Sequence, residues 1–154
     1  GDHDLVIEGL KTRGLQLDFW QIAMRPGKPL LFGRLGPVPV LGLPGNPVSA
    51  MVCAILFLLP ALSRLSGLPA APPPTIQAIA GAPLRANDHR ADHLRSTVTT
   101  DSQGRIVATP FTVQDSAMLR RLAHADALIL RAPNAPAQPE GSEVMVIRLD
   151  SLGI

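Results

Sequence analysis

The chain has 154 residues and a mass of 16.3 kDa, which is enough for one domain or two small ones. Hydrophobic residues make up 46% and charged residues 17%, a balance that excludes disorder along the whole chain. Aromatic residues make up 3%, too few for the stacking platforms of proteins that bind single-stranded nucleic acid. The single cysteine, Cys53, excludes a disulfide scaffold and a cysteine zinc cluster, and it fits a reducing compartment.

Positive charge gathers in the first half of the chain. Residues 19–87 contain no Asp or Glu, and three cations fall within residues 25–34. This group is too small for a duplex-binding patch but suits one phosphorylated small molecule, so we predict no nucleic-acid partner. The longest apolar run, residues 50–62, contains Pro60 and is shorter than the roughly twenty residues of a membrane-spanning helix, so we predict no membrane partner.

The first half reads as alternating helix, strand and loop. Hydrophobic spacing and turn residues predict a helix over 4–14, a strand over 15–23, short strands over 30–35 and 38–43, and a long helix over 47–66. Asn46 is the expected N-cap of the long helix, with Pro47 at its first position. Pro60 is expected to kink this helix because it removes one backbone hydrogen bond. The pattern is typical of half of an α/β domain, in which ligands bind beyond the strand ends.

Composition changes at Gly67, and the second half reads as strands. Prolines at 69, 72, 73 and 74 indicate a stiff linker. The strand-like segments that follow are 75–79, 94–100, 105–109, 127–131 and 143–149, with one short helix over 116–124. We predict a small antiparallel module, a partly closed β-barrel. The predicted domain bounds are 1–66 and 75–154, joined by a linker over 67–74.

Two proline-glycine loops are candidate ligand-binding segments. The first consists of Arg25, Pro26, Gly27, Lys28 and Pro29, and the second of Pro44, Gly45, Asn46 and Pro47, with Ser49 in the following helical turn. A stiff loop that presents cations suits an oxyanion, and a helix N-terminus offers unpaired N–H groups to one. Either loop alone is also explained as a tight turn with a helix cap. Together, without nearby acids, they favour an anion site.

The acidic and histidine clusters leave alternatives open. Asp2 and Asp4 either cap the first helix, hold Mg²⁺ at a phosphate, or orient an attacking oxygen. The Asp88-His89 and Asp92-His93 pairs would share a face only in a helix, and turn residues surround them, so we predict no metal site there. The apolar stretch 48–62 is either a core helix or a subunit interface.

Several segments together resemble the MoeA and gephyrin E-domain family, the molybdenum-insertion enzymes of molybdenum-cofactor biosynthesis. They are GDHD, FWQIAMRPGKPLLFG, LGLPGNPVSA, QDSAMLRRLAHADALI and EGSEVMVIRL, which span nearly the whole chain. The resemblance implies the C-terminal part of a three-layer molybdopterin-binding α/β domain, followed by a β-barrel domain. It also implies a Mg²⁺-dependent transferase that inserts molybdate, its substrate, into adenylylated molybdopterin and releases AMP. A cytoplasmic homodimer that contacts the molybdopterin adenylyltransferase is the expected state.

The family's functional positions carry over onto matching residues. The resemblance implies catalytic roles for Asp4 and Lys28, metal binding by Asp2 and Asp4, and ligand binding by both loops. It also implies that Ser116 faces the active-site cleft of a partner subunit. Two departures stand out: Arg25 replaces a lysine that is common in the family, and Gln114-Asp115-Ser116-Ala117 lacks the two glycines of the usual Gln-Gly-Ser-Gly.

Family segments that precede GDHD, including a nucleotide loop, have no counterpart here, so we expect the 154-residue chain alone to be inactive. Three alternatives remain open at this point. One is the sister activity, adenylylation of molybdopterin, which uses a related α/β domain. The second is a non-catalytic scaffold or interaction module. The third is a pair of domains that binds another phosphorylated metabolite.

Overall fold

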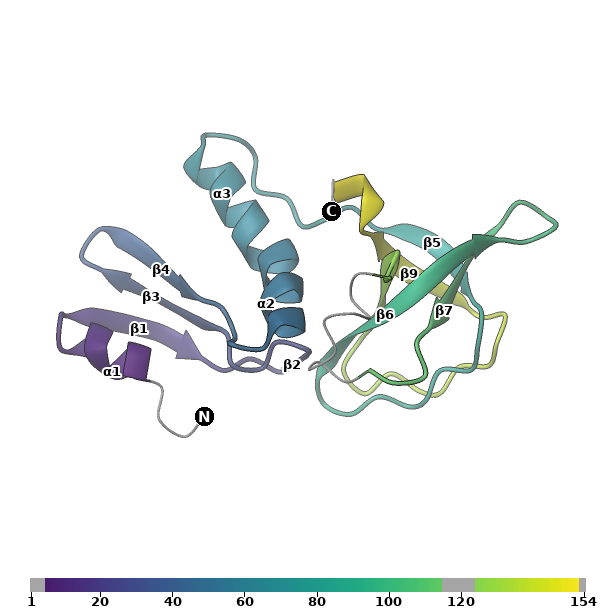
Figure 1. Cartoon of the computed structure of the whole chain (residues 1–154), viewed down its shortest axis with the longest axis horizontal. Helices are drawn as coiled ribbons and strands as arrows, with labels where there is room; N and C mark the ends of the chain where they lie inside the picture. The colour runs from purple at the N-terminus through teal and green to yellow at the C-terminus, as the bar shows by residue number, and fades with distance from the viewer. Residues whose placement is uncertain (1–4, 115–123, 153–154) are drawn as a thin grey trace.

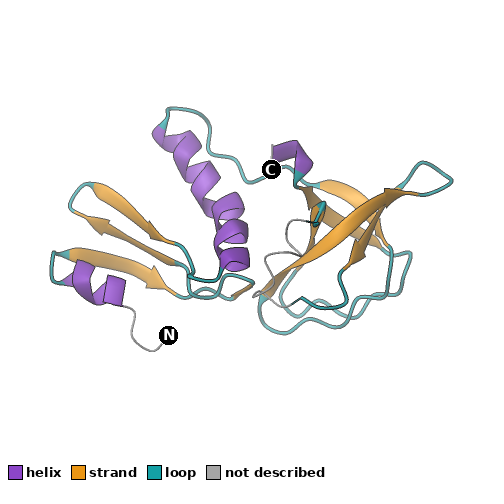
Figure 2. Ribbon diagram, in the orientation of Figure 1, coloured by secondary structure: helices purple, strands orange, loops and turns teal. Residues whose placement is uncertain are grey.

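The computed structural model describes residues 5–114 and 124–152 and consists of two parts (Figure 1). The first part contains helices and a small sheet. Its elements are α1 (Leu5–Lys11), β1 (Leu15–Trp20), β2 (Met24–Arg25), β3 (Leu31–Leu35), β4 (Val38–Gly42), α2 (Pro47–Cys53), η1 (Ala54–Leu58) and α3 (Leu59–Leu65). The second part is mostly strands: β5 (Ile76–Ala80), β6 (Ala91–Thr100), β7 (Ile106–Pro110), β8 (Ala127–Arg131), β9 (Glu143–Arg148) and the short helix η2 (Asp150–Leu152). An extended linker runs between them (Figure 2).

The sheet of the first part has the order β1-β3-β4, and both pairings are antiparallel. Leu15 pairs with Leu35, and Leu31 pairs with Gly42. The predicted strands over 15–23, 30–35 and 38–43 are therefore confirmed in place, although β1 ends earlier, at Trp20. It ends there because Gln21 has a φ of 72°, a left-handed conformation that breaks the extended strand.

The long helix is continuous over Pro47–Leu65, and its middle is a π-helical turn. Asn46 caps it as predicted, accepting hydrogen bonds from the backbone N–H groups of Val48 at 3.1 Å and Ser49 at 3.3 Å. Pro60 has no N–H to give to the preceding turn, and the wider turn of η1 lies directly before α3, which contains Pro60. Among the described helices this one is long and apolar enough to cross a membrane, a criterion that core helices of other proteins also meet.

The second part is a closed barrel, with strand order β6-β7-β5-β9-β8 and a further pairing of β6 with β8. Closure depends on the length of β6, which has ten residues. Its first half pairs with β8, from Asp92 opposite Arg131, and its second half pairs with β7, ending at Thr100 opposite Ile106. The predicted barrel is thus confirmed and is fully closed, and β5 with β7 forms one parallel pair among antiparallel ones.

The two parts touch through more than the linker. Strand β2 pairs in parallel with the start of β6, with Met24 opposite Ala91 and Arg25 opposite Asp92. One apolar cluster, which we call the shared core, contains residues of both parts: Met24, Leu30, Val52, Cys53 and Ile55 from the first, and Leu128, Ile147 and Leu149 from the barrel. The domain bounds 1–66 and 75–154 remain a prediction, and the shared core indicates that the two parts stabilise each other.

Cys53 lies in the shared core and is fully buried. Burial raises the pKa of its thiol to about 11, because the charged thiolate is poorly solvated there. We therefore expect native protein at pH 8 to react with a thiol-specific disulfide reagent about a hundredfold or more slower than the unfolded chain does. A time course of reagent release, in buffer and in urea, checks this. Equal rates in both solvents would contradict a buried Cys53.

Candidate anion-binding site

The first loop, residues 25–29, is folded back onto the chain that precedes it. The backbone N–H of Ile22 donates to the carbonyl of Lys28 at 2.9 Å, and that of Gln21 donates to Leu30 at 2.9 Å. Pro26 and Gly27 are buried, whereas Lys28 is exposed at the tip. The fold therefore fixes the backbone of the loop and leaves the ammonium group of Lys28 free to meet a ligand in solvent.

Gly27 makes the packing of this loop possible. Its φ is +124°, and a Cβ at this position would lie 2.7 Å from Sγ of Cys53 and against Cε of Met24. Such a φ is almost confined to glycine, and there is no space for a side chain. The loop therefore packs its backbone directly onto helix α2, at the level of Cys53.

The second loop precedes the same helix. Pro44 is buried, Gly45 and Pro47 are exposed, and Ser49 is buried with 6% of its surface exposed. Cys53 follows Asn46 by seven residues, so the two loops lie about 10 Å apart along the helix axis. Figure 1 shows β2 beside the N-terminal end of α2. The structure thus places both predicted loops against the first two turns of one long helix, the second loop at its start and the first loop near Cys53.

The helix N-terminus offers fewer donors than the sequence indicates. The side chain of Asn46 already accepts from the N–H groups of Val48 and Ser49. An anion at this end would have to displace Asn46 from these two N–H groups, or bind the exposed face of the loop beside Lys28. Lys28 is therefore the clearest cation of the site among the described residues of the two loops.

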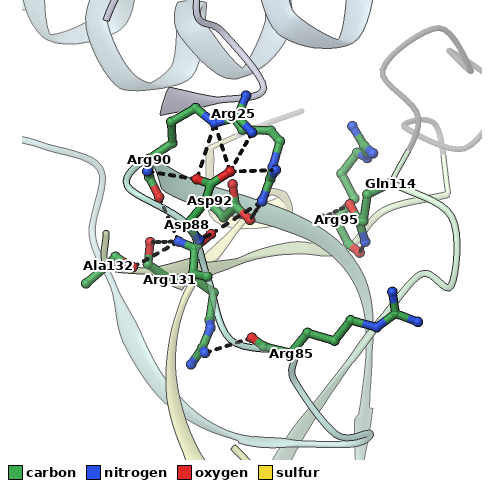
Figure 3. A network of polar contacts seen from close by, with 10 residues as sticks. Arg25, Arg85, Asp88, Arg90, Asp92, Arg95, Gln114, Arg131 and Ala132 are labelled. Atoms are coloured by element: carbon green, nitrogen blue, oxygen red, sulfur yellow. Dashed lines mark hydrogen bonds and ion pairs between the residues drawn. The ribbon is translucent and has the colours of Figure 1, made fainter. Parts of the chain in front are cut away.

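Arg25 reaches from the first part to the barrel and lies against Asp88 and Asp92 (Figure 3). Its guanidinium forms ion pairs with Asp92 and, at 3.3 Å, with Asp88, and it also donates to Oδ1 of Asn87 at 3.3 Å. Asp88 in turn accepts from Arg90 at 2.6 Å, and this pairing holds the pKa of the Asp88 carboxyl well below its usual range. The predicted anion contact of Arg25 stays a prediction, and it would require the guanidinium to leave these two carboxylates.

The two Asp-His pairs, Asp88-His89 and Asp92-His93, contribute their carboxylates to ion pairs. Asp88 and Asp92 bind arginines, and burial lowers the pKa of His93, opposed by its hydrogen bond with the backbone of Arg25. Within residues 5–114 and 124–152, no group of three His, Cys, Asp or Glu side chains is placed to hold a metal ion. The absence of a metal site at residues 88–93 stays a prediction from the sequence.

An open cavity of about 590 Å³ lies on the barrel beside Arg25. Its walls come from residues 82–87, from 110–112 and from Asp92, Leu94 and Arg131. Gln114 also lines the cavity, and its side chain accepts from the N–H of Arg95 at 3.0 Å and donates to the Arg95 carbonyl at 2.9 Å. Sequence reasoning missed Asp88 and Asp92 as partners of Arg25, because they become its neighbours only through the long-range pairing of β2 with β6. It also missed the hydrogen bonds of Gln114 with the backbone of Arg95.

Three predicted site residues, Asp2, Asp4 and Ser116, lie outside the described residues, so their assignments stay predictions. Gln114, which lines the cavity, is the last described residue before Ser116 in the chain.

Comparison with protein families decides the identity of both parts. Residues 1–64 match the family described as "Probable molybdopterin binding domain", and residues 77–149 match "MoeA C-terminal region (domain IV)". The chain belongs to the MoeA family. The expected fold, the last part of a molybdopterin-binding α/β domain followed by a barrel, is thereby confirmed.

Individual MoeA relatives agree with this assignment. A molybdopterin molybdenumtransferase from Haemophilus influenzae is 38% identical over 107 residues, which is 69% of this chain and 26% of the relative. Another from Nostoc sp. is 39% identical over 71 residues, which is 44% of this chain and 16% of the relative. The crystal structure of a molybdopterin biosynthesis MoeA protein from Pyrococcus horikosii superposes with a TM-score of 0.76 at 26% identity, over 94% of this chain and 34% of that one. The chain therefore spans about a quarter of the Haemophilus influenzae relative and about a third of the Pyrococcus horikosii protein.

Proposed function

We propose that the chain supplies part of the active site of a molybdopterin molybdenumtransferase, which inserts molybdate into adenylylated molybdopterin and releases AMP. The observation that carries this proposal is the packing of the Lys28 loop on the helix that the second loop begins, in a chain of the MoeA family. Two stiff loops against the first two turns of one helix, with an exposed lysine and no acid in residues 19–87, suit a phosphorylated ligand.

The residues of the two loops have different roles in the proposed ligand binding. Lys28 meets the phosphate or the oxyanion as a compact point charge, and it can follow the ligand because its stem is flexible. Gly27 and the flanking prolines Pro26 and Pro29 fix the loop backbone, so little ordering is left to the moment of binding. Asn46 and Pro47 fix the start of the helix. Gly45 is exposed beside them, whereas Pro44 and Ser49 are buried and support this segment. Electrostatic stabilisation of the leaving phosphate is the step these groups serve.

Magnesium, dimerisation and the cellular partners are further parts of the proposal. Asp2 and Asp4 would hold Mg²⁺, which neutralises phosphate charge when bound, since hard cations prefer carboxylate oxygens. We propose a homodimer in which Ser116 faces the cleft of the second subunit. We also propose a cytoplasmic location and a contact with the molybdopterin adenylyltransferase, because that enzyme class makes the adenylylated substrate. The relatives' names support molybdenum-cofactor biosynthesis as the setting.

Replacement of Lys28 tests the proposal in the complete gene product. We expect Lys28→Ala to weaken AMP binding about tenfold or more and to lower molybdenum insertion at least as much, because it removes the exposed cation of the first loop. Isothermal titration with AMP and an assay of AMP release measure the two effects.

The matched control is Lys11→Ala in α1, which removes the one other lysine of the sequence, at an exposed position. Its AMP affinity should stay within twofold of the parent value. Equal affinities for Lys28→Ala and Lys11→Ala would overturn the assignment of the anion site to residues 25–29.

A further inference from the structure

The contact between Arg25 and the barrel has a function of its own to explain, separate from anion binding. Arg25 belongs to the ligand loop, yet its guanidinium lies among Asp88, Asp92 and Asn87, which come from the barrel more than sixty residues later in the chain (Figure 3). We call these residues, with Arg90, the junction cluster. It lies where β2 pairs with β6, at the edge of the barrel cavity.

The charges of the junction cluster balance across the two parts. Two carboxylates, Asp88 and Asp92, face two guanidinium groups, Arg25 and Arg90, and Asp88 bridges both arginines. Asp92 depends on this arrangement most, since only 5% of its surface is exposed. Its Oδ1 is buried without a hydrogen-bond partner among the described residues, so Oδ2, which binds Arg25, carries the neutralising contact.

The same geometry restrains the backbone of the ligand loop. The N–H of Ala91 donates to the carbonyl of Ala23 at 2.9 Å, one residue before β2. Arg25 stands directly opposite Asp92 in the parallel register, so the ion pair of these two side chains lies beside the backbone pairing of β2 with β6. Loss of the ion pair leaves the buried carboxylate of Asp92 without its hydrogen-bonded cation, although Arg90 and Arg131 remain near it, and this state favours separation of β2 from β6.

We propose that Asp92 and Asp88 are positioning residues that hold Arg25 and thereby fix the anion loop to the barrel. Arg25 acts as a tie between the two parts, and Lys28 remains the cation that meets the ligand. The part of this inference that concerns ligand binding rests on the proposed function, whereas the tie itself does not. A ligand that draws Arg25 toward its phosphate has to break the junction cluster, so anion binding and the contact between the two parts are coupled.

Amide hydrogen exchange of the full chain tests the tie at the Ala91 N–H. We expect Arg25→Gln and Asp92→Asn each to speed exchange of this amide at least tenfold, and the double variant to be no faster than the faster single one. Arg25→Lys keeps the charge and should stay within threefold of the parent chain. Asp101→Asn is the matched control, because Asp101 pairs with Arg105 inside the β6–β7 hairpin, away from the junction.

Two results would overturn the tie. One is an Ala91 exchange rate in Arg25→Gln and Asp92→Asn equal to that of Asp101→Asn. The other is an equally fast rate in Arg25→Lys and Arg25→Gln, which would mean that charge does not hold the junction. Asp88→Asn changes a half-buried side chain, so the test does not depend on whether the Asp92 variant folds, and it should speed exchange about threefold.

An AMP titration of the same variants in the complete gene product separates the tie from the proposed function. With Asp92→Asn, Arg25 is released toward the ligand, and we expect AMP affinity to rise at least threefold, while Asp101→Asn leaves it unchanged. Absence of AMP binding in the parent protein would contradict the proposed function but not the tie, which the exchange rates decide. Unchanged affinity in Asp92→Asn, with AMP bound by the parent, would overturn the coupling.

Discussion

Replacement of Gly27 by alanine is expected to remove about 2–4 kcal/mol from the free energy of unfolding. The backbone at Gly27 has a φ of +124°, which a residue with a Cβ adopts only at a cost of about 1–3 kcal/mol. The new Cβ would also lie 2.7 Å from Sγ of Cys53, in a part of the shared core that has no free space. Urea unfolding followed by the emission of Trp20 measures the change.

Gly45→Ala in the second loop is the matched control for Gly27→Ala. A Cβ at Gly45 meets no atom within 4 Å, and its backbone does not need a positive φ. We expect this variant to stay within about 0.5 kcal/mol of the parent chain. If Gly27→Ala unfolds at the same urea concentration as Gly45→Ala, the loop does not pack on α2 as described. If Gly27→Ala is destabilised as expected, Lys28 also loses its fixed position, so AMP affinity falls in the same variant.

Local signals explain why much of the fold could be predicted from the sequence. The Asn46-Pro47 pair marks the start of a helix by chemistry that acts within four residues, and the helix begins there. The predicted strand over 127–131 coincides with β8, whose five residues are all buried or half-buried. A continuous apolar segment between turn residues requires burial wherever it lies, and this requirement fixes its place in the barrel core.

Long-range pairing explains what the sequence left undetermined. Arg25 reads as a ligand cation because its neighbours are a glycine and a lysine, but its partners, Asp88 and Asp92, are 63 and 67 residues away. Nothing within the first loop indicates that its two-residue strand β2 joins the barrel sheet. The parallel pairing of β5 with β7 was missed for the same reason, since side-chain alternation does not encode the direction of a neighbouring strand.

The candidate site also contains features that local sequence predicts and features that it does not. Lys28 was identified from its own loop, and the structure leaves it exposed as that reading requires. The helix N-terminus was expected to offer N–H groups, but the cap that starts the helix uses two of them, those of Val48 and Ser49. The same residue, Asn46, thus serves the fold and limits the site, a conflict that residue types alone do not reveal.

The second large effect is expected at Ile55, in the π-helical turn of the long helix. Ile55 is 1% exposed and belongs to the shared core, so Ile55→Ala should lower the free energy of unfolding by about 2–5 kcal/mol. Leu65→Ala, at a position of the same helix that is 68% exposed, is the control and should change it by less than about 0.5 kcal/mol. With a urea dependence of about 1–3 kcal/mol per molar, Ile55→Ala lowers the urea midpoint of unfolding by roughly 1–5 M.

The Ile55→Ala variant also tests whether the two parts of the chain unfold together. Leu128 and Ile147 of the barrel share the cluster with Ile55, so a cavity at Ile55 weakens both parts. Trp20 emission reports the first part, and the methyl resonances of Leu128 report the barrel. We expect both signals to shift to lower urea together in Ile55→Ala, as they should if the shared core makes the two parts one cooperative unit. A barrel signal that keeps its parent midpoint while the Trp20 signal shifts would mean that the parts unfold independently, and Arg25 would then be left as the main link between the ligand loop and the barrel.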